Sequence, residues 1–122
     1  VLTTFELDGQ TVRVLMTHID RVHDHDRQLR AIFDLFVQIQ SPAMLMGDLN
    51  TSPDNADLQA LLARPDVTDA VGGESSANRH RDYAVDWIIL RGMKCVSHEL
   101  RDLEASDHPA VCAEVELVPQ KQ

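Results

Sequence analysis

The chain has 122 residues, with 20 Asp or Glu against 11 Lys or Arg, and its formal net charge is -9. This length suits a single domain, and the acidic balance leaves no basic stripe of the kind that neutralises nucleic-acid phosphates. The charge therefore does not favour a nucleic-acid partner. Hydrophobic residues make up 43% of the sequence, yet no apolar run approaches the roughly 20 residues that span a membrane.

The first 40 residues are predicted to form two strands and a long helix. Residues 1–7 and 11–17 favour β-structure, and the Asp-Gly pair between them is a strong signal for a hairpin. Apolar side chains then recur at helical spacing over residues 26–40, until Pro42 stops the pattern. The chain begins inside the first of these strands without an initiator Met or a signal sequence, so we expect a fragment of unknown localisation.

The rest of the chain is predicted to hold four more strands and a second helix. Residues 43–47 form a short, wholly apolar run, as in a strand covered on both faces. Residues 56–63 suit a helix that ends before a proline. Residues 72–82 combine Gly, Ser, Asn and charge without periodicity, which is typical of a mobile loop. The three closing strands are expected near residues 85–90, 94–100 and 110–118. These elements predict an α+β fold with a mainly antiparallel sheet.

Polar side chains stand at four of the predicted strand ends. They are His18 after the second strand, Asp48 and Asn50 after the third, Asp86 at the start of the fourth, and Asp107 with His108 before the last. If these strands lie side by side, the polar residues meet at one edge of a sheet. Asp, Asn and His without a candidate Ser or Cys nucleophile suit metal-assisted hydrolysis, in which a divalent cation polarises a phosphoryl oxygen while a carboxylate activates water.

Asp86 opens an otherwise apolar strand, where an unpaired carboxylate would be costly to bury. A buried carboxylate also fixes the tautomer of a neighbouring imidazole and raises its pKa. We therefore expect Asp86 to form a hydrogen bond with His108. Taken alone, His18 is more typical of a histidine that merely ends a strand. Its placement in the segment THID at 17–20 favours a function instead.

Four segments resemble, in order and approximate spacing, the motifs of the endonuclease/exonuclease/phosphatase superfamily, which has the DNase I-like fold. They are THID at 17–20, GDLN at 47–50, DWIIL at 86–90 and SDHPAV at 106–111. The resemblance covers almost the whole chain but only the C-terminal half of the family's domain, which is about twice this size and packs two sheets between helices. It implies that residues 1–122 form half of an αββα sandwich, with helices on one face of the sheet.

The resemblance also implies a catalytic role for each matching residue. His18 would contact the scissile phosphate, Asp48 would orient or deprotonate the attacking water, and Asn50 would help to hold both phosphate and water. Asp86 would orient His108, which acts on the phosphate or as an acid. His18 and Asn50 would thus also bind the substrate.

The metal implied by the resemblance is Mg²⁺ or Mn²⁺, with Asp107 and Asp48 as its ligands in this chain. The family's principal metal-binding glutamate lies in the half of the domain that is absent here. We therefore expect metal-dependent hydrolysis of a phosphate ester by the complete domain, and an inactive chain on its own. The alternative is a non-catalytic binding module, or a truncated module that self-associates into a homo-oligomer through its uncovered sheet. The family acts on nucleic acid, phospholipid, inositol phosphate and nucleotide substrates, so the substrate stays open.

Arg79 and Arg81 lie in the one basic patch of this acidic chain. They would either contact a substrate phosphate or belong to a solvated loop. Family members often carry an Arg-Ile pair before the aspartate that matches Asp86, whereas this chain has Ala84 and Val85. Any role of that arginine is therefore either absent here or supplied by a residue of the loop at 72–82.

Two further groups of side chains are weaker candidates. His23 and His25 stand among aspartates, but they fall in a polar loop entering a helix, where a solvated turn is favoured over a metal cluster. Cys95 and Cys112 lack the spacing of zinc ligands. They are either buried thiols or one disulfide.

Overall fold

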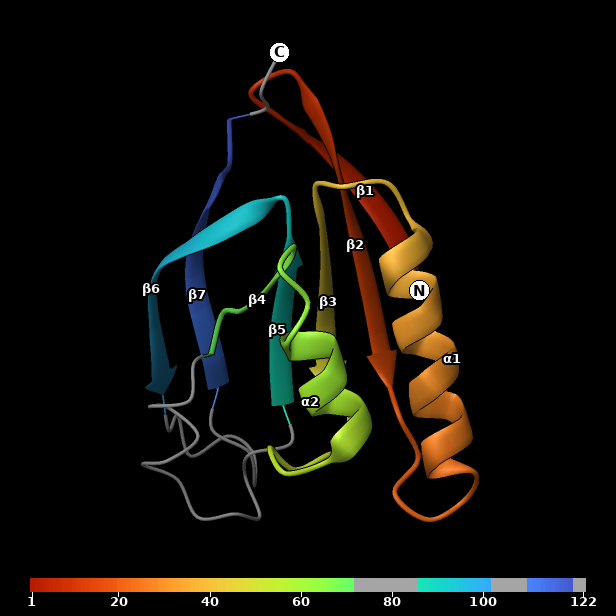
Figure 1. The fold of residues 1–122 in the computed structure, drawn as a ribbon. Helices are drawn as coiled ribbons and strands as arrows, with labels where there is room; N and C mark the ends of the chain where they lie inside the picture. Colours follow the sequence, from red (N-terminus) through yellow and green to blue (C-terminus); the bar gives the residue numbers. More distant parts are fainter. Residues whose placement is uncertain (72–85, 102–109, 120–122) are drawn as a thin grey trace.

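A computed structural model describes residues 1–71, 86–101 and 110–119 of the chain (Figure 1). The helices and strands are, in chain order, β1 (Leu2–Leu7), β2 (Gln10–His18), α1 (His25–Gln38), β3 (Ala43–Asp48), α2 (Ala56–Leu62), β4 (Val67–Asp69), β5 (Asp86–Arg91), β6 (Met93–Arg101) and β7 (Ala110–Leu117). The predicted elements are all present, with ends that agree to within two residues. β4 was not predicted. The expected mobile loop at residues 72–82 lies outside the described residues.

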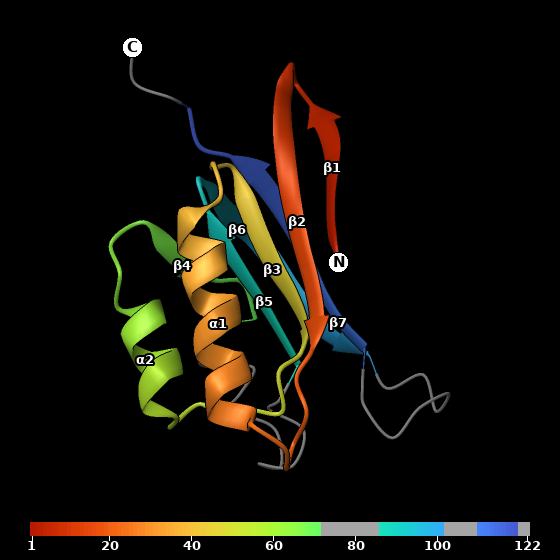
Figure 2. The same cartoon turned by 90° about the vertical axis from the view of Figure 1, so that its right-hand side faces the viewer.

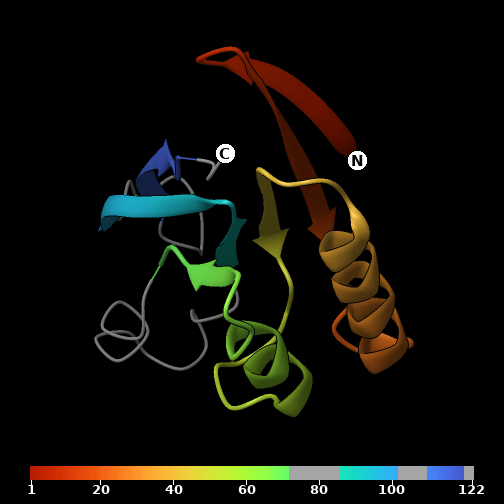
Figure 3. The ribbon, with the colours of Figure 1, turned by 45° about the horizontal axis from the view of Figure 1, so that its top comes forward.

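Within the described residues, five strands form one sheet in the order β1-β2-β3-β5-β4, and β6 pairs with β7. β2 and β3 run parallel, whereas the other pairs are antiparallel. Both helices cover the same face of the larger sheet (Figure 2). The β6–β7 hairpin and α1 lie toward opposite sides of the molecule (Figures 1 and 3). The predicted mainly antiparallel sheet with helices on one face is therefore confirmed.

The β1–β2 hairpin forms at the predicted Asp-Gly turn. Asp8 has φ 51° and Gly9 has φ 79°, and Leu7 pairs with Gln10 across the turn. Positive φ at both central residues is the geometry of a two-residue type I′ turn, whose twist matches that of the flanking strands. Local backbone chemistry thus sets the register of the first pair of strands.

The two faces of the central sheet are covered differently. Leu15, Leu45 and Ile89 are neighbours in register, so their side chains lie on the same face of the sheet. Because side chains alternate along a strand, the residues two positions away on each strand lie on this face as well. This is the helix face, where the described part of α1 buries Leu29, Phe33 and Phe36. On the opposite face, Met16, Met46 and Ile88 are neighbours in register, and Met16 is 41% exposed.

A partly buried arginine joins the sheet to α1. Arg91 Nη1 donates to the carbonyl oxygens of Phe36 and Ile39, each at 2.7 Å, and the guanidinium also lies 5.7 Å from the centre of the Phe36 ring. Phe36 lies in the last turn of α1, whose carbonyl oxygens lack partners within the helix, and Ile39 is the C-cap residue. Arg91 thereby ties the end of α1 to β5.

The two cysteines do not form a disulfide. Both are free and partly buried, because Cys95 pairs with Val115 in the β6–β7 register, whereas Cys112 pairs with Glu99. The thiol alternative is therefore correct. In the described part of the chain, no helix has the length and apolar character needed to cross a membrane.

Candidate functional site

Three of the predicted site residues form one row across neighbouring strands. His18 is opposite Asp48 in the β2–β3 register, and Asp48 is opposite Asp86 in the β3–β5 register. β2 and β3 are parallel, so their carboxyl ends meet, and antiparallel β5 begins at the same edge. Alternation places the row on the face that carries Met16 and Met46, opposite the helices. The convergence expected at one sheet edge is present for these three residues.

A glycine allows β2 and β3 to approach each other at this edge. Gly47 has φ 140°, and a Cβ added to it would lie 1.9 Å from the carbonyl oxygen of Thr17. A side chain at this position would overlap the neighbouring backbone, which only glycine avoids. Gly47 thus brings His18 and Asp48 side by side.

The carboxylate of Asp48 is oriented by the turn that follows it. Its Oδ1 accepts a hydrogen bond from the backbone N–H of Asn50 at 2.9 Å, and its Oδ2 lies 3.8 Å from Nε2 of His18. The Asp48 side chain is 25% exposed and that of His18 is 74% exposed. The carboxylate is therefore held in place at the edge of the sheet, while the imidazole stands in solvent.

Asn50 joins the loops that follow β2 and β3. It has φ 45°, a left-handed conformation that Asn tolerates better than most residues. Its Nδ2 donates to the carbonyl oxygen of Ile19 at 2.7 Å and lies 3.4 Å from Nε2 of His18. The backbone N–H of Ile19 in turn donates to the carbonyl oxygen of Asp48 at 3.0 Å. These contacts place the His18, Asp48 and Asn50 side chains together.

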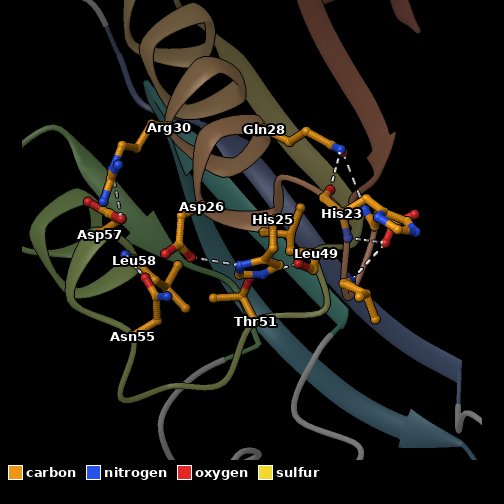
Figure 4. Close-up of polar contacts among 12 residues, drawn as sticks. His23, His25, Asp26, Gln28, Arg30, Leu49, Thr51, Asn55, Asp57 and Leu58 are labelled. Carbon is orange, nitrogen blue, oxygen red and sulfur yellow. Dashed lines mark hydrogen bonds and ion pairs between the residues drawn. The ribbon is translucent and has the colours of Figure 1, made fainter.

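The loop after His18 has its own hydrogen-bond network (Figure 4). Asp20 Oδ1 accepts from the backbone N–H groups of His23 and Val22, and these hydrogen bonds lower the pKa of Asp20. The Gln28 side chain, on α1, donates to the carbonyl oxygen of His23 at 2.9 Å. The first turns of α1 therefore hold this loop beside the site.

The sequence suggested that His25 belongs to a solvated turn, and for this residue the prediction was wrong. His25 is the first residue of α1, its side chain is 18% exposed, and its ring nitrogens contact Asp26 and Thr51 (Figure 4). His23 is exposed, as expected. His25 and Thr51 are 26 positions apart, so no local pattern in the sequence indicates their contact.

A hollow of about 520 Å³ adjoins the row of polar residues. Its walls are mainly apolar and come from β2, β3, β5 and β7, through Met16, Met46, Ile88 and Val111. Asp48 and Asp86 also line it. The carboxylates thus border an apolar surface that the helices do not cover.

Four other predicted site residues lie outside the described residues: Arg79, Arg81, Asp107 and His108. The expected hydrogen bond between Asp86 and His108 therefore stays a prediction, as do the metal role of Asp107 and the substrate contacts of the two arginines. Within the part of the chain that the structure describes, no three His, Cys, Asp or Glu side chains gather closely enough to hold a metal ion.

No protein-family model matches the sequence, and no curated protein matches it. Solved structures with a similar fold do exist. An endonuclease/exonuclease/phosphatase from Beutenbergia cavernae is 21% identical with a TM-score of 0.70; the match covers 95% of this chain and 38% of that one. D. rerio TDP2, solved with a single-strand DNA product, is 16% identical with a TM-score of 0.68, over 94% of this chain and 60% of the other. An endonuclease/exonuclease/phosphatase from Bacteroides vulgatus is 20% identical with a TM-score of 0.64, over 91% and 51%.

At these identities the likeness establishes the fold alone. The chain matches almost completely, yet it spans 38% to 60% of the lengths of these three proteins. The architecture is that of half a DNase I-like fold, in which both helices cover one face of the five-stranded sheet and β6 pairs with β7. The resemblance that the sequence motifs carry is therefore confirmed at the level of the fold.

Proposed function

We propose that this chain is the C-terminal half of an endonuclease/exonuclease/phosphatase-like domain and supplies one side of a site that hydrolyses phosphate esters. The observation that carries the proposal is the row of His18, Asp48 and Asp86, which lies across three adjacent strands of a fold shared with such proteins. The row combines a carboxylate fixed by a backbone hydrogen bond with an exposed imidazole. Water activation and phosphate binding need these two kinds of group.

Asp48 is the proposed base that orients or deprotonates the attacking water. Its hydrogen bond from the Asn50 backbone holds the carboxylate, so little reorganisation is needed when water binds. His18 is the proposed contact to the phosphate, because its ring is exposed 3.8 Å from Asp48. Asn50, whose side chain donates to the Ile19 carbonyl oxygen, would help to hold both the phosphate and the water. Asp86 would orient His108, whose role as an acid or a phosphate ligand completes the proposal.

Dependence on Mg²⁺ or Mn²⁺ is part of the proposal, but the described residues do not make a complete metal site. Asp48 is the proposed metal ligand among the described residues, and carboxylate oxygens of this kind suit Mg²⁺. Asp107 and ligands from outside this chain would have to complete the site. When bound, the metal would polarise a phosphoryl oxygen.

The missing half of the domain is the proposed partner of the apolar face beside the site. Met16 and Phe5 are 41% and 42% exposed, and the register places both on this face. Exposed apolar surface of this kind is usually covered by another protein surface. We therefore expect the isolated chain to be inactive. The substrate is a phosphate ester, contacted in the proposal by Arg79 and Arg81 as well; the net charge of -9 does not favour nucleic acid.

The experiment is a comparison of Asp48→Asn with His23→Ala in a complete domain that contains residues 1–122. Hydrolysis of bis(p-nitrophenyl) phosphate is measured with Mg²⁺, with Mn²⁺ and after EDTA. We expect Asp48→Asn to lower kcat by about 100-fold or more, since it removes the base but keeps the shape. His23→Ala, which alters an exposed ring in the neighbouring loop, should stay within about twofold. Unchanged turnover in Asp48→Asn would exclude the proposed base, and turnover that survives EDTA would exclude the metal.

The same exposed face favours a second candidate, a truncated module that self-associates without turnover. In this case Met16 and Phe5 would be buried between copies of the chain. Sedimentation of the isolated chain and of Met16→Lys distinguishes the two candidates. A dimer that Met16→Lys dissociates, together with no activity in the complete domain, supports the second candidate; a monomer at high concentration contradicts it.

A further inference from the structure

The first residue of α1 contacts the loop that carries two of the proposed catalytic residues. His25 Nε2 lies 3.0 Å from Thr51 Oγ1, and His25 Nδ1 lies 2.9 Å from Asp26 Oδ1 (Figure 4). Thr51 is 2% exposed and is the one polar residue in the described buried core. Its neighbour in sequence is Asn50. A buried polar group of this kind needs its hydrogen bonds, because an unmet one costs free energy.

Thr51 also touches the other side of the site. Its hydroxyl donates to the carbonyl oxygen of Leu49 at 2.6 Å, and its carbonyl oxygen accepts from Trp87 Nε1 at 2.9 Å. Trp87 is 2% exposed and follows Asp86 directly in β5. One residue therefore connects the loop of Asp48 and Asn50 with the strand of Asp86.

We propose that His25 is a positioning residue for the site, acting through Thr51; this role rests on the proposed function. α1 is a rigid element buried along one side, and Asp26 fixes the orientation of the imidazole. The ring therefore holds Thr51, and with it the loop and Trp87, in one place. His25 itself lies on the helix side of the sheet and does not belong to the row of His18, Asp48 and Asp86.

Two variants with similar polarity but different reach separate this role from a general loss of stability. In His25→Gln the longer side chain carries an amide nitrogen near the position of Nε2, so the contact with Thr51 is retained. In His25→Asn the amide ends near the position of Nδ1 and does not reach Thr51. His23→Ala is the control, because that ring is exposed and His23 takes part in the hydrogen bonds of the loop through its backbone N–H and carbonyl oxygen, which the substitution keeps.

The first measurement uses the chain itself and needs no activity. Trp87 is the only tryptophan, so its indole N–H gives a single resonance in a ¹H–¹⁵N spectrum. We expect this resonance to move in His25→Asn and to stay in place in His25→Gln and His23→Ala. Exchange of the Asn50 amide hydrogen should become about fivefold to tenfold faster in His25→Asn alone. An indole resonance and an exchange rate that are the same in His25→Asn and His25→Gln would overturn the proposal.

The second measurement uses the complete domain and separates positioning from folding. We expect His25→Asn to lower kcat by about tenfold to a hundredfold with KM within about twofold, and His25→Gln to restore most of it. Equal loss in both variants, or a change in KM alone, would contradict the role. Absence of turnover in the unmodified domain would refute the proposed function, whereas the spectrum of Trp87 would still decide whether His25 holds the loop.

Discussion

Substitution of Gly47 by alanine should destabilise the protein more than the same substitution at any other positive-φ glycine in its described part. The added Cβ would lie 1.9 Å from the Thr17 carbonyl oxygen and 3.0 Å from the carbonyl carbon. Both are backbone atoms of β2, so no flexible side chain can move aside. Relief requires β2 and β3 to separate at the pair that precedes His18 and Asp48.

The expected loss in the free energy of unfolding is about 2 to 6 kcal/mol. A residue with a side chain in this backbone conformation costs about 1 to 3 kcal/mol, and an overpacked group that shifts the backbone costs about 1 to 3 kcal/mol more. Typical domains are stable by about 5 to 15 kcal/mol. Gly47→Ala would therefore remove a large part of the total.

Gly9→Ala is the matched control. Gly9 also has a positive φ, 79°, but an added Cβ meets no atom within 4 Å, so only the backbone strain of about 1 to 2 kcal/mol applies. Gly92→Ala should fall between the two, because its nearest contact would be the Ser41 Cβ at 3.2 Å. All three changes remove the same glycine entropy from the unfolded chain, so their differences report the contacts.

Urea unfolding of the isolated chain, followed by Trp87 fluorescence, measures the three losses. The comparison is valid where the dependence on urea is the same in each variant. If Gly47→Ala costs no more than Gly9→Ala, the close approach of β2 and β3 at Thr17 is refuted. The geometry of the His18 and Asp48 pair would then have to be revised as well.

The remaining predictions concern Asp66 and the two cysteines. Burial raises the pKa of the Asp66 carboxyl, but hydrogen bonds from Arg91 and Arg64 outweigh this, and the net shift is downward. A lowered folded-state pKa means that ionised Asp66 stabilises the fold above the unfolded pKa of about 3.9, and that this contribution is lost as the pH falls through the folded value. Asp66→Asn should therefore lose less stability than the wild type in urea titrations between about pH 5 and pH 2; parallel curves would contradict the assignment. Since Cys95 and Cys112 are free, a reducing agent should leave Tm unchanged, and a thiol reagent should label both in the unfolded chain without prior reduction.

Local patterns in the sequence were enough to predict most of the elements. The type I′ turn needs only Asp8 and Gly9, because positive φ at two successive residues is a property of those residues themselves. The apolar spacing of α1 predicts its buried side, since a helix repeats over a few residues. β4 was not predicted, because a strand of three residues has too few positions to show an alternation of apolar and polar side chains.

The positions of some candidate site residues could be predicted for the same reason. His18, Asp48, Asn50 and Asp86 stand at strand ends that periodicity locates, and their types indicate a chemistry before any contact is known. Which strands are neighbours was not contained in these local patterns. The resemblance to a known family supplied an order and a spacing, and the register of β2, β3 and β5 then placed three of the side chains in one row.

Only the tertiary structure shows where the ring of His25 lies. Its sequence neighbours are polar and indicate a solvated turn, but packing of α1 against the sheet brings its ring to a threonine 26 positions away. The same holds for Arg91, whose carbonyl partners lie 52 and 55 positions before it. Such contacts depend on how the elements pack and not on the order of residues within any one of them. The sequence by itself determined the elements and the chemical character of their ends, while long-range packing determined which distant side chains come into contact.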